Sequence, residues 1–421
     1  MAERRTYSEI VIVGSGIEIY WLALVCSKRI PNGALIRICD LACYQQPIFS
    51  VGPWLDELHE LISVSHDDFM RLHKPRLCLG LEVQLKGKSL FLPSAPTGMS
   101  YRGVPFARLY GALGGEQLGL YAEYNYANQL HQAKSTQPPR NVASAMCEGL
   151  QMDYVIKGDE YRHFLIECLR ASGVNVALMS FEGLAADCSR EIVDSVINRA
   201  EHSNEVLFFD LTGGGGGKIS EYELESCANA EFFALNQLIY TGNNWLRSIS
   251  YDREWRLDID YSWRRPLIDM PCVLPASLHH IKLGGGVHNC LGDLSQRIFF
   301  YQLRDLHTYW PEPDVYECLA KKFNRTWQGW FADANDYYQS LYSVCVQQEP
   351  LSAANLARVE LFKETGCLPQ RDDQLVQPWE WENIFSFCLN VVPAGCCLPQ
   401  SIDPSAVLWH AQQIKRSFVI R

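Results

Sequence analysis

Residues 9–40 read EIVIVGSGIEIYWLALVCSKRIPNGALIRICD, and this stretch decides the fold. The apolar run at residues 10–13 ends in Gly14-Ser15-Gly16, and an apolar segment typical of a packed helix, residues 17–26, follows at once. A second apolar run then ends at Asp40. This order of strand, glycine turn, helix, strand and acid predicts a Rossmann-type unit. In that unit the N–H groups at the start of the helix meet a pyrophosphate, and the acid binds a ribose hydroxyl.

Two residues depart from the dinucleotide fingerprint. Ile19 stands where the third glycine is expected, and Glu18 lies beside it. A bulky side chain at that place holds the helix away from the strand, and a carboxylate near the phosphates repels them. The sequence therefore leaves two interpretations open: a bound dinucleotide, or a retained scaffold whose pocket is empty or weakened.

Composition excludes several classes of protein. The chain has 421 residues, of which 48% are hydrophobic and 20% charged, enough for a large core and two lobes. The net charge is −11 and no Lys/Arg run stands out, so we expect no nucleic-acid partner. The most apolar window, residues 10–26, is interrupted by Gly14, Ser15, Gly16 and Glu18, so we expect no membrane span. The N-terminus leads directly into the first strand without a signal peptide, which favours a cytoplasmic protein.

The 16 cysteines are scattered, and none forms a Cys-x-x-Cys pair. Without an export signal they are expected to be buried thiols rather than disulfides or zinc ligands. The cluster of His279, His280, His288 and Cys290 has no metal-site spacing, so we predict no metal.

The rest of the chain alternates apolar runs with turns. We expect strands at residues 48–52, 77–83, 89–92, 174–178 and 206–212, and helices beginning at Pro53 and Asp159. Residues 93–139 are rich in Gly, Pro, Tyr and Asn and lack periodicity, which indicates an inserted excursion. From residue 299 onward the pattern is helical and rich in aromatic residues. Trp327 and Trp330 fall on one side of a predicted helix, where they belong to the core or line a cleft.

Six segments occur in the order typical of one enzyme family: Val11 to Gly16, Phe49-Ser50-Val51-Gly52, Asp67 to Met70 with Leu77 to Leu81, Tyr161 to Gly173, Phe209-Asp210-Leu211-Thr212-Gly213, and Leu356 to Gly366. In this order the chain resembles the flavin-dependent tryptophan halogenases nearly from end to end. The resemblance implies an α/β fold with a Rossmann-like FAD-binding domain, a β-rich insertion and a helical C-terminal lobe. The implied ranges are 1–298 for the core, with a substrate-side insertion at about 93–150, and 299–421 for the lobe. The implied FAD-binding residues are Gly14, Ser15, Gly16, Asp40, Gly52, Asp210, Gly213 and Gly214.

The positions that carry the family's chemistry differ in this chain. Cys78 stands at the place of the family lysine, which holds or delivers hypohalous acid, and a thiol supplies no fixed cation. Leu294, followed by Ser295, stands at the place of the family glutamate; the neighbouring Asp293 restores a carboxylate only if the match slips by one residue. The Trp-x-Trp-x-Ile-Pro element is reduced to residues 255–260, and Pro53 replaces the glutamate that follows Gly52 in the family.

Three functions remain open on this basis. The first is a degenerate halogenase-family protein that no longer halogenates and acts as a partner or regulatory subunit of an active enzyme, or binds an aromatic small molecule. The second is an FAD-dependent monooxygenase or oxidoreductase acting on an aromatic or indolic substrate in a biosynthetic pathway. The third is a halogenase with replaced catalytic residues. We expect Glu18 and Ile19 to weaken FAD binding, and a test of FAD binding separates the first function from the second. The sequence also leaves open whether the protein is a dimer.

Overall fold

The fold is that of a computed structural model, which describes most of the chain. The described residues are 6–31, 33–41, 48–85, 88–133, 153–180, 195, 206–211, 218–222, 233–240, 245–250, 256–261, 280–283, 294–312, 316–346, 350–371 and 374–417. The chain forms two compact units, each assembled from three stretches of sequence. Unit 1 comprises residues 1–75, 156–217 and 267–332, and unit 2 comprises residues 76–155, 218–266 and 333–421. Residue 298, the end of the predicted first range, lies inside a helix of unit 1.

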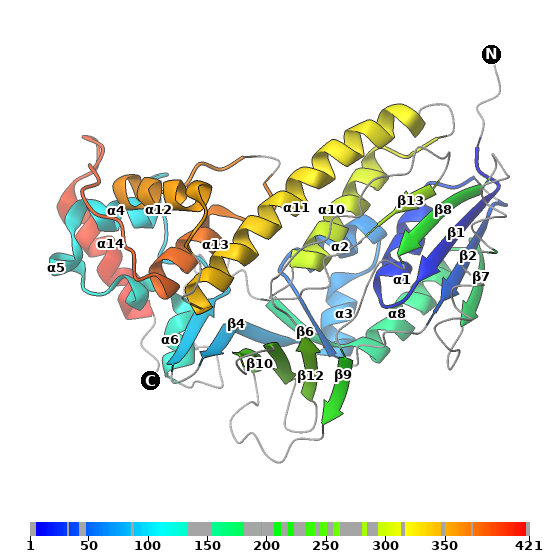
Figure 1. The fold of residues 1–421 in the computed structure, drawn as a ribbon, viewed down its shortest axis with the longest axis horizontal. Coiled ribbons are helices and arrows are strands. Elements are labelled where there is room, and N and C mark those ends of the chain that lie inside the picture. Colours follow the sequence, from blue (N-terminus) through cyan, green and yellow to red (C-terminus); the bar gives the residue numbers. More distant parts are fainter. Residues whose placement is uncertain are drawn as a thin grey trace. The chain divides into compact units, whose positions relative to one another are not determined.

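Unit 1 contains the predicted Rossmann sheet (Figure 1). Its strands are β1 (Glu9–Gly14), β2 (Leu35–Asp40), β7 (Asn175–Ser180), β8 (Val206–Leu211) and β13 (His280–Lys282). The order is β13-β8-β1-β2-β7, and every neighbouring pair is parallel. The central strand β1 is apolar on both faces, as expected for a parallel sheet that is covered on both sides. The predicted strand, turn, helix, strand and acid are thereby confirmed.

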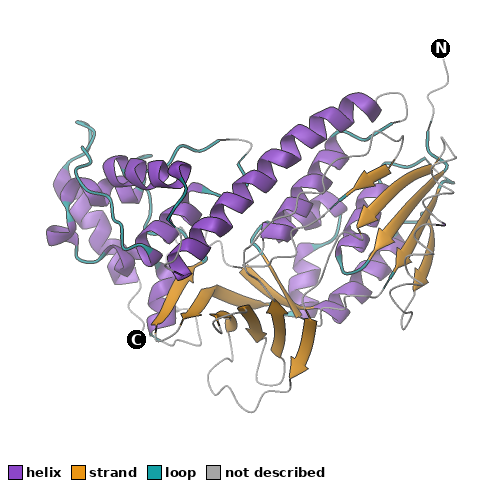
Figure 2. Ribbon diagram, viewed as in Figure 1, coloured by secondary structure: helices purple, strands orange, loops and turns teal. Residues whose placement is uncertain are grey.

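Unit 1 also contains the helices α1 (Glu18–Ser27), α2 (Leu55–Ile62), α3 (His66–His73), α8 (Gly158–Ala171) and α10 (Leu294–Thr308). Of these, α1 packs on β1 and β2 of this sheet (Figure 2). Every residue of α1 from Ile19 to Cys26 is buried, because α2, α8 and α10 all contact it. A helix enclosed on all sides needs no polar face, which explains why the sequence of α1 is apolar throughout. The predicted core role of Trp327 and Trp330 is confirmed, since they are 0% and 3% exposed.

The second sheet has eight strands in the order β3-β6-β4-β10-β11-β12-β9, with β5 paired to β4. The strands are β3 (Ile48–Val51), β4 (Arg76–Leu85), β5 (Lys88–Pro93), β6 (Asp153–Lys157), β9 (Lys218–Tyr222), β10 (Phe233–Tyr240), β11 (Trp245–Ser250) and β12 (Arg256–Tyr261). The register of β4 against β10 shifts between Cys78 and Leu81, which places a bulge at Leu79-Gly80.

The β-rich part of the fold is this sheet, whereas the segment predicted as the β-rich insertion is helical where it is described. Residues 93–133 form α4 (Phe106–Leu113), α5 (Gly115–Leu118), the 3-10 helix η1 (Tyr121–Tyr124) and α6 (Tyr126–Gln132). Gly114 and Gly119, with φ of 80° and 83°, end α4 and α5 after one or two turns. Helices this short contain too few turns to show a hydrophobic periodicity, which is why the sequence pattern did not predict them.

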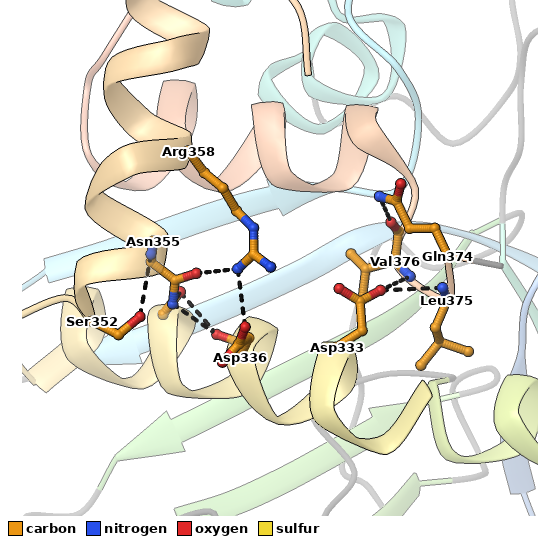
Figure 3. Close-up of polar contacts among 9 residues, drawn as sticks. Asp333, Asp336, Ser352, Asn355, Arg358, Gln374, Leu375 and Val376 are labelled. Atoms are coloured by element: carbon orange, nitrogen blue, oxygen red, sulfur yellow. Dashed lines mark hydrogen bonds and ion pairs between the residues drawn. The ribbon is translucent and has the colours of Figure 1, made fainter. Parts of the chain in front are cut away.

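The C-terminal region is helical, as predicted. It contains α11 (Tyr316–Val346), α12 (Ala353–Thr365), α13 (Pro378–Asn383), the π-helix η2 (Ile384–Cys388) and α14 (Pro404–Ser417). A group of polar residues joins three of its segments (Figure 3). Asp333 on α11 accepts hydrogen bonds from the N–H groups of Leu375 and Val376 at 3.1 and 2.9 Å. One turn later, Asp336 accepts a 3.2 Å bond from Arg358 on α12. These bonds fix α12 and the 374–376 segment to one face of α11.

Among the described helices, none is both long and apolar enough to cross a membrane.

Candidate functional site

The turn after β1 lies at the carboxyl edge of the parallel sheet, where ligands bind in this class of fold. The register places Gly14 between Asp40 on β2 and Leu211 on β8, and places Val13 beside Asp210. The structure therefore brings together the predicted residues Gly14, Ser15, Gly16, Asp40 and Asp210.

Gly14 has no room for a side chain. A Cβ at this position would lie 2.7 Å from Leu211 Cβ and 3.0 Å from Ile19 Cγ2. Ile19 is fully buried, so its side chain fills the space that a third glycine would leave open between helix and strand. Gly16 has φ +90°, a conformation that a glycine adopts without strain. The turn thus has the first two glycines of the dinucleotide fingerprint, whereas the Ile19 side chain fills the space at the third.

Glu18 places its own carboxylate on the turn. A Cβ at Gly16 would lie 2.7 Å from Glu18 Oε2, so the carboxylate lies directly against the Gly16 backbone. Burial raises the pKa of the Glu18 carboxyl, and bonds from the backbone at Glu18 and Ile17 oppose that rise. The N-cap residue Ile17 offers no side-chain cap, so Glu18 accepts the bonds that a Ser, Asp or phosphate oxygen accepts at other helix starts.

Asp40 is also engaged by protein groups. Its carboxylate, which is 3% exposed, accepts a hydrogen bond from the Tyr20 hydroxyl at 2.7 Å. Arg162 Nη1 on α8 lies 3.8 Å from the same oxygen, Asp40 Oδ2. Sequence reasoning missed both partners, because their approach depends on how α1 and α8 pack on the sheet. The acid predicted to bind a ribose is therefore held by a phenol and a guanidinium.

The other predicted cofactor residues are placed as follows. Gly52 forms the turn between β3 and α2, where its carbonyl accepts a bond from Leu55 N at 3.2 Å. The carbonyl of Asp210 accepts a 2.9 Å bond from Leu283 N, and the residue is 6% exposed. Gly213 and Gly214 lie outside the described residues.

The three predicted catalytic positions belong to different units. Cys78 lies on β4 in unit 2, whereas Leu294 and Ser295 begin α10 in unit 1. Cys78 is 0% exposed, and its thiol donates to the carbonyl of Gly80 at 3.3 Å within the bulge. Leu294 is 2% exposed. Asp293, the residue that a one-position slip would recruit, lies outside the described residues, as do the histidines at 279 and 288 and Cys290. The described residues contain no group of His, Cys, Asp or Glu arranged to hold a metal.

A chain of polar groups behind α1 was not visible in the sequence. Trp21 Nε1 donates to the Tyr161 hydroxyl at 3.2 Å, and Tyr161 Oη lies 2.6 Å from His59 Nε2. His59 Nδ1 in turn lies 2.9 Å from His66 Nδ1. Burial, with His66 and His73 nearby, lowers the pKa of His59 to about 3, so its imidazole is neutral. Its position in the core gives this chain of bonds a structural role.

Comparison with known proteins gives the family. The sequence profile of the family described as tryptophan halogenase matches residues 9–235, more than half of the chain. This chain belongs to the tryptophan halogenase family. Family membership implies FAD binding at the Rossmann-type domain. A search of curated proteins gave no match.

Solved structures of flavin-dependent halogenases share the fold of this tryptophan halogenase family member. BrvH, a flavin-dependent halogenase from Brevundimonas sp. BAL3, has 13% sequence identity and a TM-score of 0.73, with 98% of this chain and 96% of that chain covered. Xcc4156 from Xanthomonas campestris has 14% identity and a TM-score of 0.73, with 98% and 95% covered. The tryptophan 6-halogenase SttH from Streptomyces toxytricini has 13% identity and a TM-score of 0.67, with 97% and 96% covered. The chain therefore spans nearly the whole length of these enzymes.

Proposed function

We propose that this protein is a tryptophan halogenase family member that does not halogenate. Its role is that of a non-catalytic partner or regulatory subunit of an active enzyme, or of a pseudoenzyme that binds an aromatic small molecule. Its affinity for FAD is weakened by Glu18 and Ile19.

The observation that carries the proposal is the position of Glu18. A pyrophosphate at this turn would need the N–H groups of Ile17 and Glu18 and the space over Gly16, and the Glu18 carboxylate already uses both. An ionised Glu18 would repel a second anion placed there by several kcal/mol at an effective dielectric constant of about 20, and a protonated Glu18 would still occupy the space over Gly16. The residues present therefore do not fit the pyrophosphate of FAD unless the Glu18 side chain moves away.

Asp40 and Ile19 support the same conclusion. A ribose hydroxyl would have to compete with Tyr20 for Asp40 Oδ2. The Ile19 side chain packs against Gly14 and therefore keeps a pyrophosphate from approaching the strand closely.

The positions of the halide chemistry point to the same proposal. At the place where the resemblance puts the family lysine, Cys78 is buried and bonded to Gly80, so it offers no ammonium group. At the place of the family glutamate, Leu294 is buried and carries no carboxylate. A protein without these two groups cannot hold and polarise hypohalous acid in the way the family does.

The test is a titration with FAD, followed by flavin fluorescence and thermal unfolding. We expect no saturation by the wild type up to ~100 μM FAD, a concentration that would stabilise a protein of 1 μM affinity by ~2.7 kcal/mol. The double substitution Glu18→Ala, Ile19→Gly should gain measurable affinity, provided that circular dichroism shows the fold intact. The matched control is Glu60→Ala, which removes an exposed carboxylate from α2 and should gain none.

A second candidate function is kept because the sheet edge still carries Gly14, Gly16 and Asp40 in Rossmann geometry. It is an FAD-dependent monooxygenase acting on an aromatic or indolic substrate. Micromolar FAD binding by the wild type, with reduction of the flavin by a flavin reductase, would favour this candidate and overturn the first. Cys78→Lys alone should not create halogenation, because the carboxylate is also missing. Chlorination or bromination of indole by that single variant would contradict the loss of the whole site.

A further inference from the structure

Three thiols of unit 2 lie near the C-terminal end of α12. Cys367 follows Gly366, the residue at which α12 ends, and Cys396 and Cys397 are adjacent in the segment before α14. All three are free thiols; Cys397 is exposed, and the other two are half-buried. This separates them from Cys26, Cys39 and Cys78, which are buried in the sheets and in α1.

Helix α4 lies against both Gly366, the residue before Cys367, and Cys396. Gly366, in the left-handed conformation with φ +66°, lies so close to α4 that a Cβ would be 2.5 Å from Arg108 Cα. At Gly111 of the same helix, a Cβ would be 2.7 Å from Cys396 Sγ. Residues three apart on a helix are neighbours on one face, about 5–6 Å from each other. Cys396 and the residue preceding Cys367 therefore contact adjacent positions of one helix face.

Hydrogen bonds fix the two segments to each other. Cys396 Sγ donates to the carbonyl of Glu364 at 3.5 Å, and Ala394 N donates to the carbonyl of Lys363 at 2.9 Å. Cys367 comes three residues after Glu364. The electrostatics agree with this proximity, because burial raises the pKa of Cys396, the thiols of Cys367 and Cys397 add to the rise, and Arg108 opposes it.

We propose that Cys367 and Cys396 are a modification site, at which a hydroperoxide converts the two thiols into an intramolecular disulfide. One thiolate attacks the peroxide, the O–O bond breaks, and an alcohol or water leaves while the sulfur becomes a sulfenic acid. The second thiol attacks that sulfur, the S–S bond forms, and water leaves. The two sulfur atoms together lose two electrons, and the peroxide bond accepts them.

The bond would join the end of α12 to the segment before α14 and enclose α13 and η2 in a covalent loop. Because a cross-link removes conformations from the unfolded chain, the oxidised protein should unfold at a higher temperature than the reduced one. A Cys396–Cys397 bond between adjacent residues would enclose no such loop.

The experiment treats the reduced full-length protein with hydrogen peroxide, blocks remaining thiols, and digests it with trypsin without reduction. Cleavage after Lys363, Arg371 and Lys415 puts Cys367 in peptide 364–371 and Cys396 in peptide 372–415. We expect mass spectrometry to find these peptides linked, with fragmentation placing the bond at Cys396. The link should persist in Cys388→Ser and Cys397→Ser, the matched controls within the same peptide, and disappear in Cys367→Ser and Cys396→Ser.

Two results would overturn the proposal: a bond confined to peptide 372–415, or oxidation of Cys367 and Cys396 to sulfinic or sulfonic acids without a link. The wild type also tests the proposal without any variant. Its link should be selective in the folded protein and should give way to mixed pairings when the same oxidation is carried out in guanidinium chloride, so equal mixtures in both conditions would reject a preformed pair.

Discussion

The hydroxyl of Tyr20 donates a 2.7 Å hydrogen bond to Oδ2 of Asp40, and both side chains are almost fully buried. Tyr20 lies in the first turn of α1 and Asp40 at the end of β2, so the bond links the helix that follows the glycine turn to the strand beside β1. Arg162 Nη1 lies 3.8 Å from the same oxygen, so a phenol and a guanidinium of the protein both stabilise the carboxylate.

Tyr20→Phe should therefore lower the free energy of unfolding by about 1–3 kcal/mol, the usual cost of removing a partner from a buried charged group. Urea denaturation at pH 7 measures the change. Tyr309→Phe is the control, since Tyr309 is 42% exposed, and its effect should stay within about 0.5 kcal/mol. Equal effects of the two variants would show that the bond to Asp40 contributes nothing.

His59 should make the protein sensitive to acid. Its folded-state pKa of about 3 lies below the ordinary value of 6.5, so the unfolded chain binds a proton more readily. The stability this gives is complete above pH 6.5 and is lost as the pH falls toward 3. At pH 5 the loss amounts to ~2 kcal/mol. The unfolding free energy of His59→Gln should fall less steeply between pH 7 and pH 5 than that of wild type, whereas His163→Gln, at an exposed position of α8, should follow the wild-type slope.

Glu382 should act in the opposite direction. Burial raises its pKa from 4.5 to about 7, so the folded protein binds the proton more tightly than the unfolded chain does. Glu382 therefore costs stability as the pH rises from 4.5 through 7, and the cost persists above that range. Because the residue is half-buried, we expect Glu382→Gln to gain ~2 kcal/mol over wild type between pH 5 and pH 8. A parallel pair of pH profiles would contradict this, and Glu364→Gln, at an exposed position, should give such a pair.

The hydrogen bonds of Asp333 should contribute more to the stability of the fold than its negative charge does. Its Oδ2 accepts from two backbone N–H groups, those of Leu375 and Val376, whose side chains are fully buried (Figure 3). Asp333→Ala removes the acceptor and should cost about 1–3 kcal/mol, whereas Asp333→Asn keeps an acceptor oxygen and should cost less. Thermal and urea unfolding of the two variants give the comparison. Equal losses for Asn and Ala would show that the negative charge, which both variants lack, matters rather than the acceptor oxygen that only Asn keeps.

Much of the fold of unit 1 could be predicted from the sequence. Strand β1, the glycine turn and the acid at the end of β2 are local features, and each apolar run is long enough to show its type. Helix α1 was predicted one residue early, at Ile17, because its first turn already forms there through the bond from Tyr20 N to Ile17 O. The parallel neighbour β8 was visible as an apolar run, residues 206–209, followed by Asp210-Leu211.

Two kinds of feature could not be predicted from the sequence: the directions of side chains, and contacts between residues that are far apart in the chain. That Glu18 turns toward Gly16, rather than away into solvent, depends on its rotamer, which no pattern of residue types encodes. The approach of Arg162 to Asp40 needs α8 to cross the sheet edge at one place, over 120 residues from the acid. The meeting of Cys396 with Gly111 depends in the same way on how a loop near the C-terminus packs on α4.

The carboxylate that lies on the glycine turn has a consequence for how this protein is maintained in a cell. A flavoprotein gains stability from its cofactor in proportion to the logarithm of the cofactor concentration, so its abundance falls when the vitamin precursor of the flavin is scarce. Here the carboxyl group at the start of α1 is encoded in the chain as Glu18, and it is synthesised with every copy. Under the proposal that Glu18 excludes FAD, the amount of folded protein should be independent of riboflavin supply.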